Sequence, residues 1–238
     1  MLEFKLEKKE LPFAMAEEIK NLRTAITFSG DNIKVVAFTS SVPSEGKSTI
    51  SLETVRSFAE LGKKTLFIDC DLRKSEIIRK ITDGVVKKGL THYLTGQCKL
   101  EDIVYKNRSD KGETEYYVIP AGPMSSSPSE LLASDKFRDM IAKLRNEYDM
   151  IIIDTPPLNS VIDASIISAC ADGSIIVIQA AGVNYQIVQK VRDKIKLSDS
   201  RILGVVLNKV DRSSKNYGYY KYGKKYGYGY SYGYGENQ

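Results

Sequence analysis

The stretch from Lys34 to Leu61, KVVAFTSSVPSEGKSTISLETVRSFAEL, decides the fold class of this chain. Residues 34–39 form a short, mostly apolar run that predicts a β-strand, and residues 49–61 predict a helix. The loop between them ends in Gly46-Lys47-Ser48. In a strand–loop–helix context, the backbone N–H groups at the helix N-terminus point at phosphate, so the stretch predicts a phosphate-binding loop.

The predicted loop offers candidate contacts to a nucleotide at Ser44, Glu45, Gly46, Lys47, Ser48 and Thr49. The Lys47 ammonium is expected to reach the β- and γ-phosphate oxygens of ATP, and the Ser48 hydroxyl to hold Mg²⁺. One position departs from the GxxxxGK[ST] pattern, because Ser41 stands where its first glycine belongs.

Further apolar, β-branched runs alternate with helical stretches along the rest of the chain. The runs are 65–68, 116–119, 150–153, 174–179 and 202–207, and the helical stretches include 128–148 and 184–197. Strands that are almost continuously apolar and alternate with helices form parallel sheets covered on both faces. We therefore expect an α/β fold with a mostly parallel β-sheet and helices on both faces.

Aspartates follow two of the predicted strands. Asp69 and Asp71 come at the end of one strand, and Asp154 ends another. Open parallel sheets bind ligands at this edge, and an aspartate there beside a phosphate loop positions Mg²⁺. Each aspartate taken singly also fits a helix cap, but the convergence of these sites on one edge favours the nucleotide-site interpretation.

Asp69 and Asp71 are separated by one residue, which allows them to divide two tasks. One carboxylate can hold the metal while the other accepts a proton from an attacking hydroxyl. A tyrosine hydroxyl, with a pKa of about 10, is a better proton donor to a carboxylate than a serine hydroxyl. This pair therefore suits a tyrosine acceptor, and the residues alone do not decide which aspartate is the base.

Composition limits the remaining possibilities. The chain has 238 residues, of which 42% are hydrophobic, enough for one α/β domain and a tail. Its net charge of +5 is small and scattered, so we expect no nucleic-acid partner. The three cysteines lack disulfide or zinc spacing, and no apolar run is long enough to span a bilayer.

The two ends of the chain differ from its middle. Residues 16–26 place Ile19, Leu22 and Ile26 on one face of a predicted amphipathic helix. Residues 217–235 contain nine tyrosines and six glycines, which cannot build a core and predict a disordered tail. The tail tyrosines are Tyr217, Tyr219, Tyr220, Tyr222, Tyr226, Tyr228, Tyr230, Tyr232 and Tyr234.

The ordered motifs TSSVPSEGKST, LFIDCDLRK, IPAGPMSSSPSELL, YDMIIIDTPPLNSVIDA and GVVLNKV, followed by the tyrosine-glycine tail, resemble a bacterial tyrosine kinase of the capsular or exopolysaccharide type. The resemblance implies a P-loop fold of the MinD and ParA type, with ATP and Mg²⁺ as cofactors. It implies autophosphorylation of the tail tyrosines and regulation of polysaccharide synthesis and export. It also implies a cytoplasmic location at the inner membrane face, a transmembrane adaptor of the polysaccharide co-polymerase type, a ring-shaped homo-oligomer and a cognate tyrosine phosphatase.

Carried onto this chain, the resemblance assigns Lys47 and Ser48 to Walker A, Asp69 and Asp71 to Walker A′, and Asp154 to Walker B. It makes Lys47, Asp69, Asp71 and Asp154 catalytic, with Ser48, Asp71 and Asp154 at the metal and Asp69 favoured as the base. Asn208 matches a position that contacts adenine, although an asparagine there also caps turns. Asp163 matches a family aspartate with a structural or metal-shell role.

The resemblance divides the chain into an N-terminal helical oligomerisation segment (1–32), a P-loop kinase domain (33–212) and a phosphoacceptor tail (213–238). Glu17, Lys20 and Arg23 match the family's E-x-x-R-x-x-R motif for ring assembly. Lys20 departs from it, and lysine does not reproduce the planar fork of arginine. An ordinary solvated helix is the alternative interpretation.

Two other functions remain open at this point. A P-loop partitioning or positioning ATPase without protein kinase activity would release phosphate and form no phosphotyrosine. Alternatively, a tail with aromatic rings between Lys221, Lys224 and Lys225 could act as an adhesive or RNA-binding segment, although it lacks RGG repeats.

Overall fold

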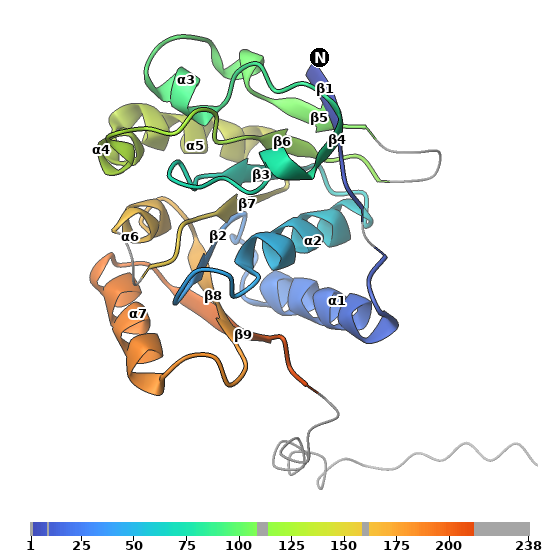
Figure 1. Cartoon of the computed structure of the whole chain (residues 1–238), viewed down its shortest axis with the longest axis vertical. Helices are drawn as coiled ribbons and strands as arrows, with labels where there is room; N and C mark the ends of the chain where they lie inside the picture. Colours follow the sequence, from blue (N-terminus) through green and yellow to red (C-terminus); the bar gives the residue numbers. More distant parts are fainter. Residues whose placement is uncertain (1, 9, 109–113, 159–161, 212–238) are drawn as a thin grey trace, which may run out of the picture.

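The computed structural model describes residues 2–8, 10–108, 114–158 and 162–211. One sheet crosses this part of the molecule, and helices cover it on both faces (Figure 1). The strand order is β4-β1-β5-β6-β3-β7-β2-β8-β9. This architecture confirms the expected α/β fold with a mostly parallel sheet.

All the strands predicted from apolar runs are present. They are β2 (Val35–Ser40), β3 (Thr65–Asp69), β6 (Tyr117–Ile119), β7 (Met150–Asp154), β8 (Gly173–Gln179) and β9 (Ile202–Asn208). Neighbouring strands in this set run parallel to one another.

The sheet also contains strands that the sequence analysis did not identify: β1 (Leu2–Leu6), β4 (Ile81–Gly84) and β5 (Tyr105–Asn107). β5 is antiparallel to β6, β1 is parallel to β5, and β4 is antiparallel to β1. These strands are short, and β4 is mostly exposed, so their apolar pattern is weak.

The alternation of side chains along the central strands builds two cores. Val35 and Ala37 of β2 pack in the core that includes Phe137 and Leu144, whereas Val36 and Phe38 pack in the other core. Successive side chains of a strand point to opposite faces, so one strand contributes to both layers. Full burial of β2, β3 and β7 explains why their runs are apolar without alternation.

The helices are α1 (Phe13–Phe28), α2 (Lys47–Ala59), α3 (Leu90–Leu94), α4 (Pro128–Ala133), α5 (Asp135–Glu147), α6 (Asp163–Ser168) and α7 (Tyr185–Leu197), with short 3₁₀ turns at Ile78–Lys80 and Leu100–Asp102. α1 and α2 lie on one face of the sheet, and α4 to α7 lie on the other (Figure 1).

The helix expected over residues 128–148 is in fact two helices. Ser134 has an extended backbone (ψ 152°) and separates α4 from α5. Its hydroxyl accepts a hydrogen bond from the Phe137 N–H at 3.3 Å, which caps α5. The prediction of one continuous helix was therefore wrong, because the serine acts as an N-cap inside the apolar pattern.

The first residues of the chain belong to the same folded body as the rest. β1 joins the sheet, and α1 packs on α2 through Ile19 and Ile26. The predicted domain boundaries remain predictions, and residues 213–238 with their tyrosines lie outside the described residues. Within the described ranges, no helix is long and apolar enough to cross a membrane.

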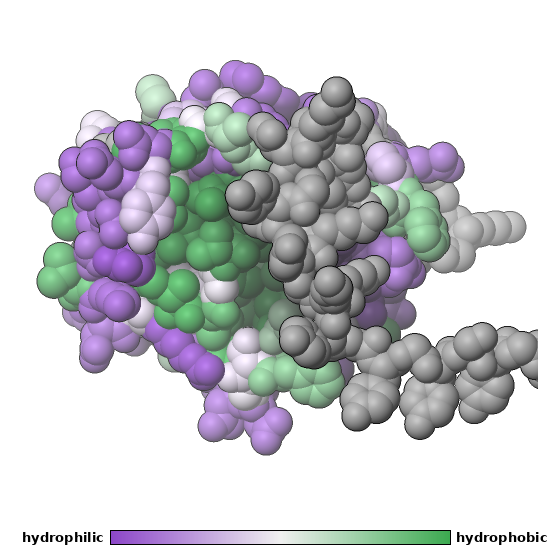
Figure 2. All heavy atoms as spheres, turned by 90° about the horizontal axis from the view of Figure 1, so that it is seen from below, coloured by the Kyte–Doolittle hydropathy of each residue, from purple (hydrophilic) through white to green (hydrophobic). Residues whose placement is uncertain are grey.

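β9 forms one edge of the sheet, opposite the edge formed by β4. Its side chains Val205 and Leu207 are 52% and 41% exposed. From the β9 side of the molecule, Figure 2 shows a hollowed surface of apolar side chains. β9 therefore combines an edge position with exposed apolar residues.

Candidate active site

The phosphate-loop segment leads directly into α2, whose first residue is Lys47. Gly46 precedes the helix with φ 90°, a left-handed conformation that favours glycine. A Cβ at this position would lie 2.1 Å from Asn208 Nδ2. The backbone angle therefore favours glycine at position 46, and a side chain there would displace the Asn208 amide.

A cavity of about 380 Å³ opens above this loop. Its wall includes the whole predicted set from Ser44 to Thr49, together with Asp71. The rest of the wall comes from Ser40, Pro43, Arg73, Lys74, Glu76, Pro156 and Pro157. The structure thus brings the loop and one of the predicted carboxylates around a single cavity.

Lys47 and Asp154 form the central contact of the site. Lys47 Nζ lies 2.6 Å from Asp154 Oδ1, and both side chains are buried. The same carboxylate oxygen accepts a hydrogen bond from Ser51 Oγ at 3.1 Å. Lys47 Nζ also lies 3.1 Å from Ser48 Oγ. This cluster places the candidate phosphate-binding ammonium beside two candidate metal ligands.

Asp69 lies on β3 directly opposite Asp154 on β7. Burial, together with the nearby Asp154 carboxylate, raises the pKa of Asp69 to about 7. Its Oδ2 accepts a hydrogen bond from Ser75 Oγ at 2.5 Å, and its Oδ1 accepts one from the Asp71 N–H at 3.1 Å. Asp69 is only 1% exposed and is not part of the cavity wall, so it sits behind the surface that Asp71 lines.

Asp71 takes the more accessible position of the two. Its Oδ1 accepts hydrogen bonds from the N–H groups of Lys74 at 2.9 Å and Arg73 at 3.3 Å. These bonds form a turn after β3, and Arg73 and Lys74 of this turn line the cavity with Asp71. The structure therefore separates the two aspartates of the D-x-D pair into a buried carboxyl and a cavity-lining one.

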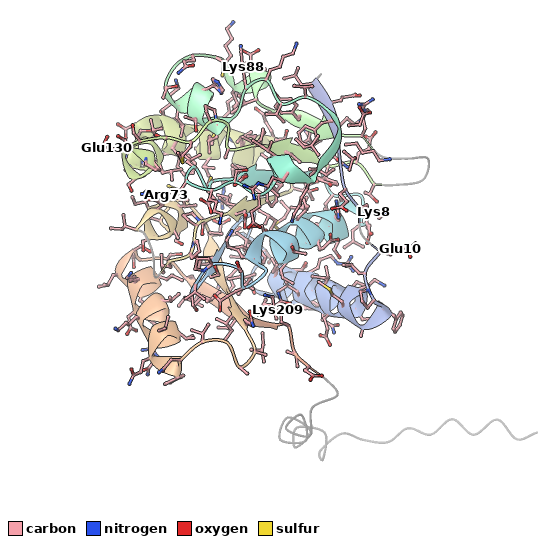
Figure 3. All side chains as sticks on the ribbon, viewed as in Figure 1. Lys8, Glu10, Arg73, Lys88, Glu130 and Lys209 are labelled. Carbon is pink, nitrogen blue, oxygen red and sulfur yellow. The ribbon has the colours of Figure 1, made fainter. Side chains whose placement is uncertain are left out.

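Asp163 holds Arg73 in place at the rim of the cavity. The Arg73 guanidinium donates to Asp163 Oδ2 from Nε at 2.7 Å and to Oδ1 from Nη2 at 3.3 Å. Ser129 Oγ contacts both side chains. Figure 3 shows Arg73 beside α4 and α6, the helices that carry these partners. Asp163 is thus engaged in a structural ion pair.

The structure gives Glu45 and Asn208 contacts that the sequence analysis did not predict. The Glu45 carboxylate is 1% exposed and accepts hydrogen bonds from backbone N–H groups. Asn208 Nδ2 donates to the Glu45 carbonyl oxygen at 2.8 Å. The Asn208 amide thus contacts the loop itself, and its predicted contact with adenine remains a prediction.

Several residues at the site were missed by the sequence analysis. Ser51 lies one helical turn after Lys47, so the i,i+4 spacing on α2 was an available signal. Arg73 stood inside the LFIDCDLRK motif without an assigned role. Ser75, Gln179 and Lys209 reach the site from loops and strand ends, and no local pattern marks them.

Ser41 replaces the first glycine of the motif without backbone strain. Among the described residues, the non-glycine positions with positive φ are Ser44, Ala181, Asp199 and Lys209, and Ser41 is not among them. Its buried hydroxyl has no hydrogen-bond partner in the described part of the protein. A side chain is therefore tolerated at position 41, although its hydroxyl is not used.

The candidate oligomerisation residues lie on α1 and divide into two groups. Lys20 Nζ pairs with Glu17 Oε1 at 2.7 Å on the exposed surface. Arg23 instead donates from Nη1 to the carbonyl oxygen and hydroxyl of Ser57 on α2, at 2.8 Å and 3.0 Å. Arg23 thus contributes to packing within the chain, while Glu17 and Lys20 remain at the surface.

Comparison with known proteins places this geometry in a family. A family model described as an AAA domain matches residues 33–204. Tyrosine-protein kinase CpsD of Streptococcus agalactiae is 40% identical over 210 residues, which cover 88% of this chain and 90% of that protein. The chain belongs to the bacterial tyrosine-protein kinases. Tyrosine-protein kinase YwqD of Bacillus subtilis is 34% identical to this kinase, and the match covers 86% of each chain.

Solved structures agree with this assignment. The kinase domain of the Escherichia coli tyrosine kinase ETK superposes with a TM-score of 0.76 at 26% identity, covering 96% of this kinase and 87% of that chain. The septum site-determining protein MinD from Pyrococcus horikoshii, solved with Mg-ADP, gives a TM-score of 0.61 at 25% identity, covering 76% and 72%. The fold is therefore the P-loop type shared with MinD, and the enzyme is a protein-tyrosine kinase.

Proposed function

We propose that this kinase transfers the γ-phosphoryl group of ATP to tyrosines in its own C-terminal segment, Tyr217 to Tyr234, and so regulates capsular or exopolysaccharide synthesis and export. The observation that carries the proposal is the placement of the D-x-D pair at the phosphate-loop cavity: Asp71 lines the cavity, and the Asp69 carboxyl lies buried opposite Asp154. Burial raises the pKa of Asp69 to about 7, which suits a group that takes up a proton near neutral pH. A partitioning ATPase needs no such proton acceptor for tyrosine, and the named relatives are tyrosine kinases.

The cavity residues have complementary roles in nucleotide binding. The N–H groups at the start of α2 face the phosphates, and the Lys47 ammonium exchanges its contact with Asp154 for the β- and γ-oxygens. Ser48, Asp71 and Asp154 offer the hard oxygen atoms that Mg²⁺ prefers, and two carboxylates with phosphate oxygens are a usual set for this ion. When bound, Mg²⁺ neutralises charge between the phosphates.

The chemical step follows from this arrangement. The tyrosine oxygen attacks the γ-phosphorus while the bond from that phosphorus to the β,γ-bridging oxygen breaks, so that ADP leaves. Asp69 accepts the phenolic proton. The hydrogen bond from Ser75 Oγ to Asp69 Oδ2 must open for this transfer, because it occupies that oxygen and the carboxyl is only 1% exposed. Lys47 stabilises the negative charge on the transferring group.

Relatives support a link to polysaccharide export through a membrane partner. The succinoglycan biosynthesis transport protein ExoP of Rhizobium meliloti is 31% identical over 222 residues, and this match covers 89% of this chain but 28% of that protein. The region of ExoP that matches this chain is therefore joined to a much longer remainder. We infer that a transmembrane adaptor of the polysaccharide co-polymerase type recruits the kinase to the inner membrane face and activates it.

Ring assembly and reversal of phosphorylation complete the proposal. Glu17 and Lys20 are accessible for contacts between copies, whereas Arg23 is engaged with Ser57. The ring therefore relies on fewer charged groups than the full family motif provides. A cognate tyrosine phosphatase removes phosphate from the tail and resets the cycle.

The test is phosphotyrosine mapping by mass spectrometry after incubation of the full chain with ATP, Mg²⁺ and a peptide from the adaptor's cytoplasmic segment. Phosphate is expected on the tail tyrosines of the wild type and on none in Lys47→Met. A variant with all tail tyrosines changed to Phe separates tail phosphorylation from phosphorylation elsewhere. Phosphotyrosine confined to sites outside 217–234 would remove the tail from the proposal.

A further inference from the structure

The side chains of two residues, one at the end of β9 and one just after it, hold the phosphate loop in place. Lys209 Nζ donates to the carbonyl oxygen of Ser44 at 2.7 Å and to Gln179 Oε1 at 3.0 Å. Asn208 Nδ2 donates to the carbonyl oxygen of Glu45 at 2.8 Å. Figure 3 shows Lys209 where the chain leaves β9, on the side of the molecule where α2 begins.

The Glu45 side chain also holds the loop in place, through hydrogen bonds to its carboxylate. Its Oε2 accepts hydrogen bonds from the N–H groups of Ser41 at 2.6 Å and Val42 at 2.9 Å. Its Oε1 accepts one from the Gln179 N–H at the end of β8, at 3.0 Å. One buried carboxylate thus joins the beginning of the loop to a neighbouring strand.

Backbone strain at two of these residues indicates that the contacts determine the local conformation. Ser44 has φ 66° and Lys209 has φ 55°, both in the left-handed region that L-residues rarely adopt. Such residues persist where surrounding contacts impose them. The hydrogen bond from Lys209 Nζ to Ser44 O connects these two strained positions directly.

The negative charge of a glutamate next to a phosphate site repels phosphate unless that charge is neutralised. Three backbone N–H groups donate hydrogen bonds to the Glu45 carboxylate and offset its charge. The same hydrogen bonds hold the loop in place. They also keep the side chain inside the protein, where its carboxylate bonds to the N–H groups of Ser41, Val42 and Gln179 and not to those at the start of α2.

We propose that Glu45 and Lys209 are positioning residues that hold the phosphate loop in its nucleotide-binding shape by fastening it to the ends of β8 and β9. This inference rests on the proposed use of the loop for ATP. Neither side chain needs to touch the reacting atoms. These hydrogen bonds also connect the loop to Asn208 and Lys209, which lie a few positions before the predicted tail.

The test measures binding of fluorescent mant-ADP with Mg²⁺ to the full chain, alongside thermal unfolding. Glu45→Gln retains at most two of the three hydrogen bonds, because the amide nitrogen of glutamine is a donor and cannot accept a hydrogen bond from a backbone N–H. We expect its Kd for mant-ADP to rise about 10-fold, and that of Lys209→Met about 3-fold, from the loss of one or two hydrogen bonds. KM for ATP should rise in step, with a smaller change in kcat.

Matched controls separate positioning from general destabilisation. Glu53→Gln removes a charge from another, partly buried glutamate, which pairs with Arg56 and does not line the cavity. Lys196→Met removes an exposed lysine on α7. Both controls should keep the wild-type Kd. Because Glu45 and Lys209 act on one loop, the double variant should lose less affinity than the product of the two single losses.

Two results would overturn the proposal in distinguishable ways. If folded Glu45→Gln and Lys209→Met bind mant-ADP as the wild type does, while Lys47→Met is inactive, the positioning role is wrong and the ATP site stands. If Lys47→Met retains phosphoryl transfer, the use of this loop for ATP is itself wrong, whatever the other variants do.

Discussion

Lys47 on α2 and Asp154 on β7 form a buried ion pair, with 2.6 Å between Nζ and Oδ1. The pair joins two segments more than 100 residues apart in sequence. It keeps the ammonium beside the cavity, and it gives Lys47 a structural contact in addition to its proposed role with ATP. Substitutions at these two positions therefore have separable effects on activity and stability.

Lys47→Met is expected to lower tail phosphorylation at least about 100-fold, because it removes a charge aimed at the transferring phosphate. It should also destabilise the fold by about 3 kcal/mol, since Asp154 is left buried without its ion-pair partner. Adding Asp154→Asn should restore much of the stability and none of the activity. Urea unfolding and phosphotyrosine blotting measure the two effects, and a double variant no more stable than Lys47→Met would contradict the structural role.

Asp69→Asn should abolish transfer and change how stability depends on pH. The pKa of Asp69 is about 7 in the folded protein and near 3.8 when unfolded, so the unfolded chain releases its proton first as pH rises. The wild type should therefore lose about 2–3 kcal/mol of stability relative to Asp69→Asn between pH 5 and pH 8. Urea unfolding in nucleotide-free, Mg²⁺-free buffer at both pH values tests this. If the two proteins differ by the same free energy of unfolding at both pH values, the pKa of Asp69 is not raised in the folded protein.

Asp71→Asn should act on metal-dependent binding more than Asp69→Asn does, because Asp71 lines the cavity and Asp69 is buried behind it. We expect the Mg²⁺ concentration needed for half-maximal mant-ADP binding to rise about 10-fold in Asp71→Asn and to stay near the wild-type value in Asp69→Asn. Fluorescence titration at fixed nucleotide measures both. The reverse order of effects would exchange the proposed roles of the two carboxyls.

Ser41→Ala should be neutral or slightly stabilising, by up to about 1 kcal/mol, because the buried Ser41 hydroxyl has no partner in the described part of the structure. Gly46→Ala is the contrasting change, since it introduces a Cβ into a left-handed position against Asn208. It should lower both stability and ADP affinity. Thermal unfolding of both variants provides the comparison, and a destabilised Ser41→Ala would indicate that its hydroxyl is bonded.

Phosphorylation of the tail should dissociate the proposed ring. Residues 217–238 carry a charge of about +2 from three lysines and one glutamate. Nine phosphotyrosines would change this to about −11 to −16, and several such tails on one ring would repel one another. Light scattering of Lys47→Met, of the ATP-treated wild type and of the tail Tyr-to-Phe variant measures the mass. The repulsion should weaken with added salt, and an oligomer of unchanged size after exhaustive phosphorylation at low salt would refute the switch.

The sequence by itself determined the central strands, the phosphate loop and the edge of the sheet that carries Asp69, Asp71 and Asp154. Strand and helix periods, Gly46-Lys47-Ser48 and aspartates at strand ends are local features, and the geometry of a parallel sheet brings its strand ends together without further information. The division of residues 128–148 by Ser134 and the short strands β1, β4 and β5 were missed, because capping and weak apolar patterns compete with the dominant periodicity.

Only the tertiary structure decided which of these residues touch. It paired Lys47 with Asp154, placed Asp69 behind Asp71, turned Glu45 inward onto Gln179 and brought Lys209 to Ser44. It also engaged Arg23 with Ser57 and Arg73 with Asp163. A local pattern constrains backbone angles and burial, whereas the partner of a polar side chain depends on strand order and on rotamers selected by packing, which join residues distant in the chain.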